Sequence, residues 1–131
     1  MLRLRLALAF LMVASGIGCT FPQEQMDSKF GDQNFKTSIA LIELHHTRTG
    51  VYPESLRDLK FVGDWDQIAL GAVEYRKLAE GYELNIVRGW VGKPSLAFPP
   101  AFWHGLGLRK SNVRSLVGGE ATHDSAATNE P

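Results

Sequence analysis

Residues 44–59, LHHTRTGVYPESLRDL, contain the end of one helix, a corner and the beginning of a second, shorter helix. Gly50 lacks a Cβ atom, so it can adopt the left-handed conformation that ends many helices. Tyr52 precedes a proline and is therefore biased toward an extended conformation. Pro53 has no N–H to lose, so it suits the first position of a helix. We interpret this stretch as a structural corner that joins two helices.

An amphipathic pattern precedes the corner and predicts a long helix, with Asp32 as its N-cap. Leu41 and Leu44 lie near one side of this helix, and the residues expected to contact the core lie on the other. Those core residues follow at helical spacing: Phe35, Ile39, Ile42 and His46. A helix with two apolar edges usually packs on both sides. We therefore expect the leucine edge to contact another part of this chain or a partner protein.

Two segments after the corner alternate between apolar and polar residues and predict strands: residues 72–78 (AVEYRKL) and 82–87 (YELNIV). The residues between them, Ala79–Gly81, suit a hairpin loop. We expect further strands around Ser95–Phe98 and near Leu106–Arg109. The order of elements indicates an α+β fold, with one long N-terminal helix and a short helix packed on a small antiparallel sheet.

The N-terminal residues have the order of a secretory signal. Arg3 and Arg5 precede an apolar run, Leu6–Ala14, which is followed by small residues. The run is far shorter than the ~20 residues of a spanning helix. One interpretation is removal by the ordinary signal peptidase, with no role for the cysteine that follows.

The other interpretation is lipidation, because the single cysteine, Cys19, directly follows Ser-Gly-Ile-Gly. This resembles the lipobox of bacterial lipoproteins, although Gly16 stands where leucine is most common. The resemblance implies a diacylglyceryl group on the Cys19 thiol, a palmitoylated mature N-terminus and a location in the cell envelope. Thr20 replaces the aspartate that retains many lipoproteins in the inner membrane, which favours the outer membrane, facing the periplasm.

The chain therefore divides into four expected parts. Residues 1–18 are a signal peptide, and residues 19–32 are the lipidated cysteine and a polar tether. Residues 33–110 form one α+β domain. Residues 111–131 sustain no pattern and are expected to be disordered.

Parts of the domain also resemble the soluble head of type II secretion pseudopilins and related type IV pilin-like proteins. The likeness covers about residues 36–88. Its matching features are the Gly50–Pro53 step, Leu56 and Leu59 after it, Tyr75, and the strand that starts with Gly81–Leu84. It implies a pilin-like α+β fold. It does not imply a pilus subunit, because the leader lacks the long hydrophobic helix through which pseudopilins polymerise.

The candidate binding residues are apolar. Prolines stiffen the segment from Trp90 to Trp103, which reduces the entropic cost of presenting aromatic side chains to a partner. The alternative is that these rings cover the open face of the sheet. The residues expected to contact a partner are Leu41, Leu44, Trp90, Phe98, Phe102 and Trp103.

Polar candidates are fewer. His45 and His46 are adjacent, so on a helix they point about 100° apart and cannot share a metal without residues from elsewhere, such as His104. Asp64 and Asp66 are expected on a solvated loop around Trp65. The residues indicate no cofactor, no metal site and no convergent catalytic set.

The formal net charge is zero and no basic face stands out, so the sequence does not predict nucleic-acid binding. We expect a membrane-anchored envelope lipoprotein that binds or scaffolds another envelope protein, for example in a secretion or pilus-type machine. The alternative is a small envelope enzyme or a metal or ligand binder that uses His45, His46 or His104.

Overall fold

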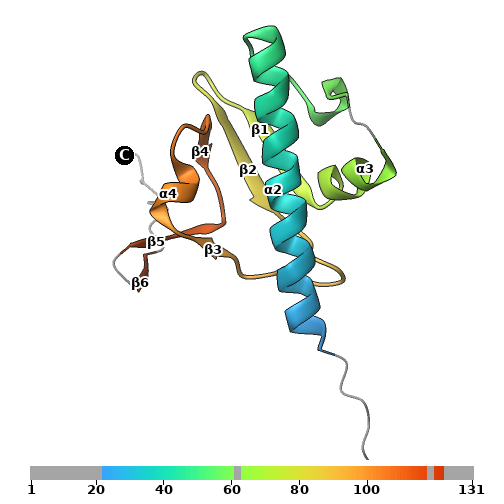
Figure 1. The fold of residues 1–131 in the computed structure, drawn as a ribbon, viewed down its shortest axis with the longest axis vertical. Coiled ribbons are helices and arrows are strands. Elements are labelled where there is room, and N and C mark those ends of the chain that lie inside the picture. The colour runs from blue at the N-terminus through green and yellow to red at the C-terminus, as the bar shows by residue number, and fades with distance from the viewer. Residues whose placement is uncertain (1–21, 61–62, 118–119, 123–131) are drawn as a thin grey trace, which may run out of the picture.

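The computed structural model describes residues 22–60, 63–117 and 120–122, and its architecture is α+β as expected. A long helix, α2 (Gln23–Thr49), lies across a hairpin of two strands, β1 (Val73–Lys77) and β2 (Tyr82–Ile86), as Figure 1 shows. The core lies between this helix and the hairpin. Its largest fully buried side chains include Phe35, Ile42, Tyr82, Leu84 and Ile86.

Helix α2 begins earlier than predicted. Its first residue is Gln23, and the N–H of Met26 already donates to the carbonyl oxygen of Pro22 at 3.0 Å. Asp32 is therefore not the N-cap, and the predicted tether over residues 19–32 is wrong from residue 23 onward. The polar first turns are stabilised by packing against a distant segment, which the local pattern does not reveal.

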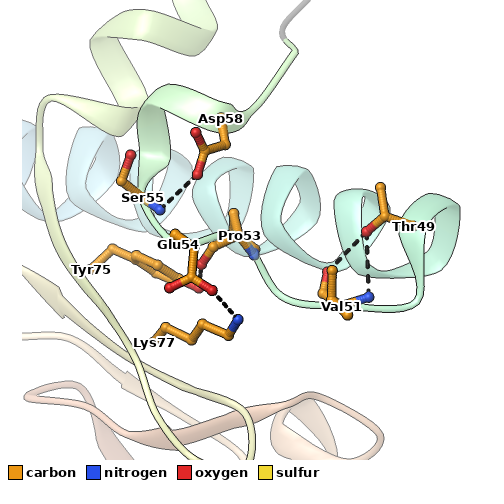
Figure 2. A network of polar contacts seen from close by, with 8 residues as sticks. All are labelled: Thr49, Val51, Pro53, Glu54, Ser55, Asp58, Tyr75 and Lys77. Atoms are coloured by element: carbon orange, nitrogen blue, oxygen red, sulfur yellow. Dashed lines mark hydrogen bonds and ion pairs between the residues drawn. The ribbon is translucent and has the colours of Figure 1, made fainter.

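The corner ends α2 as predicted. Gly50 has φ 78°, and its N–H donates to the carbonyl oxygen of His46 at 2.8 Å. Figure 2 shows how the following residues are held: the Thr49 hydroxyl bonds the backbone of Val51, and the Tyr75 hydroxyl donates to the carbonyl oxygen of Pro53 at 2.6 Å. The stretch is therefore a structural joint between the helix and the hairpin.

The second helix is shorter than predicted and starts later. It is a single 3-10 turn, η2 (Leu56–Asp58), and its N-cap is Ser55. The Ser55 hydroxyl accepts from the N–H of Arg57, and the Asp58 carboxylate accepts from the N–H of Ser55 at 3.0 Å. Pro53 is therefore buried at the corner, not the first residue of the helix.

A further helix, α3 (Asp64–Leu70), follows η2 where a solvated loop was expected. Asp64 and Asp66 lie in its first turn, where their negative charges are favourable toward the positive end of the helix dipole. The close carboxylates are thus explained by the helix, and the loop prediction is wrong.

The first sheet has the order β1-β2-β4, with β4 at Leu108–Lys110. β1 and β2 are antiparallel, as predicted, with Tyr75 opposite Leu84. β2 and β4 are parallel, with Tyr82 opposite Leu108. The sheet is therefore mixed: the β1-β2 pair is antiparallel as predicted, and the β2-β4 pair is not.

A second sheet has the order β3-β5-β6, with β3 at Ala97–Phe98, β5 at Arg114–Val117 and β6 at Glu120–Thr122. β5 runs parallel to β3, and a short helix, α4 (Pro100–Trp103), follows β3. Both later strands come from the predicted disordered tail, so the domain does not end at residue 110.

Two residues before β5 attach this region to the core. The Asn112 side chain donates to the carbonyl oxygen of Ile86 at 2.8 Å and accepts from its N–H at 2.9 Å. Val113 is buried in the same cluster as the inner face of α2. The tail prediction failed because these contacts join residues far apart in the sequence.

The predictions for residues 1–18 and for Cys19 lie outside the described residues. Within residues 22–60, 63–117 and 120–122, no helix combines the length and the apolar character that are needed to cross a membrane.

Candidate functional site

An open groove of about 490 Å³ lies between α2, α3 and the segment that follows β2. Its walls combine apolar and polar side chains, among them Phe30, Asn34, Thr37, Trp65, Ile68, Arg88 and Trp90. We call it the tryptophan groove, because two indole rings from different elements line it. Its volume falls in the range of about 300–1,000 Å³ that is usual for ligand pockets.

Large apolar side chains are unusually exposed around the tryptophan groove. The side chain of Trp65 on α3 is 76% exposed, and that of Trp90 is 46% exposed. Ile68, Val87 and Val91 on the same two segments are also exposed. Single exposed apolar residues are ordinary, but a cluster of them beside a groove marks an interaction site.

The wall that carries Trp90 is held by one buried carboxylate, that of Asp27 on α2. Its Oδ1 accepts from three consecutive backbone N–H groups, those of Trp90 at 2.9 Å, Val91 at 2.6 Å and Gly92 at 2.9 Å. The hydrogen bond from Val91 is the largest cause that lowers the pKa of Asp27 below its ordinary value of 3.8, and together with the other hydrogen bonds it outweighs the effect of burial. Residues 89–92, which we call the Trp90 loop, are therefore fixed to the first turns of α2.

The close contact between this loop and α2 requires glycine in the loop. A Cβ atom on Gly89 would lie 2.1 Å from the backbone oxygen of Asp27, and one on Gly92 would lie 2.9 Å from its carboxylate. On the helix, a Cβ atom on Gly31 would lie 2.3 Å from the ring of Pro94. The absent side chain of Gly31 therefore lets the loop pack on the helix.

The opposite wall is α3, which packs on the middle of α2. Ser38 is fully buried between the two helices, and its hydroxyl lies 2.8 Å from the carbonyl oxygen of Asn34 and 3.3 Å from that of Ala69. Ala69 is buried at the same contact, while Trp65, one turn earlier on α3, points outward. Both indoles are thus presented by anchored elements.

The predicted leucine edge of α2 lines a second, smaller groove of about 240 Å³. Leu44 is exposed and Leu41 is half-buried against the core. His45 and Arg48 line the same groove, together with Leu59 and the residues beside it. Leu41 therefore packs within the chain, and Leu44 is the exposed residue of this edge.

The late aromatic residues are packed together. Phe98 is only 7% exposed, and its ring stacks on Phe35 of α2 at 6.0 Å between centroids. Phe102 and Trp103 are half-buried and contact Phe98 at 4.4 and 6.2 Å. The Trp103 indole N–H also donates to the carbonyl oxygen of Phe98 at 3.4 Å. Phe98 is therefore a core residue with little surface for a partner, which corrects its prediction as a contact.

The histidines are in three different settings. The ring of His46 stacks on that of Tyr52, with centroids 4.1 Å apart and planes 8° apart. His45 is half-buried in the smaller groove, and His104 is exposed after α4. Among the residues that the structure describes, no group of three or more His, Cys, Asp or Glu side chains is arranged to hold a metal ion.

Sequence reasoning missed the central polar contact, which is made by Glu43 on α2. Its Oε1 accepts from the Tyr82 hydroxyl at 3.0 Å and from the N–H of Gly107 at 2.7 Å, and its Oε2 accepts from the Tyr52 hydroxyl at 3.2 Å. Burial, together with this carboxylate, raises the pKa of both tyrosines. The tyrosines were visible in the sequence, but no local signal links them to residue 43.

Comparison of the chain with protein-family models, with curated proteins and with solved structures found no match.

Proposed function

We propose that this chain is a lipid-anchored protein of the bacterial envelope that binds another envelope protein and has no catalytic role. The anchor is the lipid on Cys19, and the domain faces the periplasm from the outer membrane. The observation that carries the proposal is the pair of exposed indole rings, Trp65 and Trp90, on two walls of one groove.

The groove is suited to a protein partner for energetic reasons. Tryptophan is among the residues that dominate binding energy at interfaces, because it contributes a large apolar area with few rotatable bonds. Ordering a flexible loop on binding costs free energy. Here the Trp90 loop is already held by three hydrogen bonds to Asp27, so that cost is reduced.

The lining also indicates what kind of segment fits. Phe30 and Ile68 supply apolar side chains to the lining, while Asn34 and Thr37 supply polar ones. Arg88 at the edge suits a carboxylate. We expect a peptide segment of the partner with apolar side chains and a neighbouring acidic residue. The pilin-head resemblance favours a partner in a secretion or pilus-type machine.

The experiment is site-specific crosslinking in native membranes. A photo-reactive amino acid at Gln33, in the groove, is expected to capture one discrete partner. Trp65→Ala should abolish that crosslink and leave the melting temperature unchanged, because the ring is mostly exposed. A truncation at an interface anchor costs ~2 kcal/mol or more of binding, which is about thirtyfold in affinity.

Val51→Ala is the matched control, since Val51 is 57% exposed and lies at the corner, outside both grooves. It should leave the crosslink intact. If the same product formed with Trp65→Ala as with the unchanged chain, the tryptophan groove would not be the binding surface.

A further inference from the structure

The tryptophan groove has one wall at the end of the domain nearest the expected anchor. Cys19 and Pro22 are separated by three peptide links, which span at most ~11 Å. Asp27 lies only about 6 Å beyond Gln23 along the axis of α2. With the link from Pro22 to Gln23 and the hydrogen bond from Val91 to Asp27 included, the Trp90 loop is therefore within roughly 25 Å of the anchoring cysteine.

Figure 1 shows the same relation, because the segment between β2 and β3 passes around the N-terminal half of α2. The opposite end of α2 is about 40 Å away, since the helix has 27 residues. The corner at Gly50 and the exposed Val51 lie at that distant end. An anchor at Cys19 thus distinguishes the two ends of the molecule by their distance from the membrane.

The side chains of the loop have the chemistry of a membrane interface. Trp90 is 46% exposed and Val91 is 59% exposed, next to each other on a loop that the Asp27 carboxylate fixes. Tryptophan is enriched at the level of the lipid headgroups, where its ring is partly apolar and its N–H can bond. Two exposed cations, Arg88 and Lys93, flank the pair and suit anionic headgroups. The same end of the molecule also carries an exposed acidic residue, Glu24, on the first turn of α2.

We infer that the Trp90 loop contacts the surface of the bilayer in which the protein is anchored, with Val91 in the headgroup layer and Trp90 at its boundary, where the ring still lines the tryptophan groove. This inference rests on the lipid anchor of the proposed function. The contact sets the orientation of the domain, with the tryptophan groove opening beside the membrane and the corner pointing away from it. A partner must then bind through a segment that lies close to the membrane.

The test uses the full chain, matured in bacteria and reconstituted in vesicles of phosphatidylethanolamine and phosphatidylglycerol. The mass of the mature N-terminus is measured first. Cysteines are then introduced singly as Val91→Cys and Val51→Cys and carry a nitroxide label. Cys19 does not react once it is lipidated. The two positions are matched, because the side chains that they replace are 59% and 57% exposed.

The measurement compares collisions of each label with oxygen, which concentrates in lipid, and with a water-soluble nickel chelate. We expect the ratio of oxygen to nickel collisions to be several-fold higher at residue 91 than at residue 51. Equal ratios in a chain whose lipidation is verified would overturn the membrane contact alone. An unmodified N-terminus would instead refute the lipid anchor on which the contact depends.

Discussion

Glu43 shows how one side chain can connect parts of the chain that have no local relation. Its carboxylate accepts hydrogen bonds from the corner (Tyr52), from β2 (Tyr82) and from the backbone before β4 (Gly107). A Cβ atom on Gly107 would lie 1.9 Å from the Tyr52 hydroxyl, so the loop can approach only as glycine. The polar contact therefore fixes where the corner and β4 meet α2.

We expect the two substitutions of Glu43 to differ in cost. Glu43→Gln keeps an acceptor and a similar shape, so it should lower the free energy of unfolding by about 1 kcal/mol. Glu43→Leu leaves three donors without their acceptor and should cost roughly 2–4 kcal/mol. Urea denaturation measures both. Glu74→Gln, on the exposed side of β1, is the control and should be nearly neutral.

Asp27 makes a second prediction at this scale, and it concerns pH. Its folded pKa lies below the ordinary 3.8, so the folded chain binds this proton more weakly than the unfolded chain. The stabilisation is fully present above pH 3.8 and is lost as the pH falls through the folded pKa. The Asp27→Asn variant has no proton to bind there.

We therefore expect the stability difference between the unchanged chain and Asp27→Asn to shrink as the pH falls below 3.8. Urea midpoints of both proteins, measured from neutral to acidic pH, give this difference directly. A difference that stayed constant over the whole range would show that the charge of Asp27 does not stabilise the loop.

At the scale of elements, the corner after α2 depends on one backbone conformation. Gly50 has φ 78°, and nothing lies within 4 Å of where its Cβ atom would be. Any cost of a side chain there is therefore backbone strain without steric overlap. Gly63, before α3, has the same open space but an extended backbone with φ −161°.

This pair gives a matched prediction. Gly50→Val should lower the free energy of unfolding by about 1 kcal/mol or more, because a β-branched residue is forced to positive φ. Gly63→Ala should be close to neutral, since alanine restricts the unfolded chain without backbone strain in the folded one but is a poorer N-cap for α3 than glycine. Thermal or urea unfolding of both variants decides the matter. Equal effects would mean that the left-handed turn is not what ends α2.

Elements determined by neighbouring residues could be predicted from the sequence. The glycine that ends α2 and the alternation that forms β1 and β2 are such local signals, and both were confirmed. The first turns of α2 were missed because they depend on Asp27 binding a loop more than sixty residues away. Strand β5 was missed because it depends on pairing with β3. The tryptophan groove was missed for the same reason, as its walls come from three separate segments. Trp90 alone among its aromatic residues was predicted as a contact.

At the scale of the whole molecule, the tryptophans Trp65, Trp90 and Trp103 divide between surface and packing. Trp65 stands on α3 with most of its ring in solvent, and Trp90 forms part of the groove wall. Trp103 packs edge-on against Phe102 at 5.1 Å and rests against the buried Phe98. The aromatic residues that could bind a partner and those that hold the second sheet to the core are therefore different residues.

This division predicts opposite results for two alanine substitutions. Trp103→Ala removes a ring from the packed cluster and should lower the free energy of unfolding by about 3 kcal/mol, the lower end for such truncations because the ring is only half-buried. Trp65→Ala removes a mostly exposed ring and should change it by less than about 0.5 kcal/mol. Urea denaturation of the two variants under the same conditions measures both values. If Trp65→Ala were as destabilising as Trp103→Ala, the Trp65 indole would support the fold. The tryptophan groove would then be a packing defect and would offer no prepared surface to a partner.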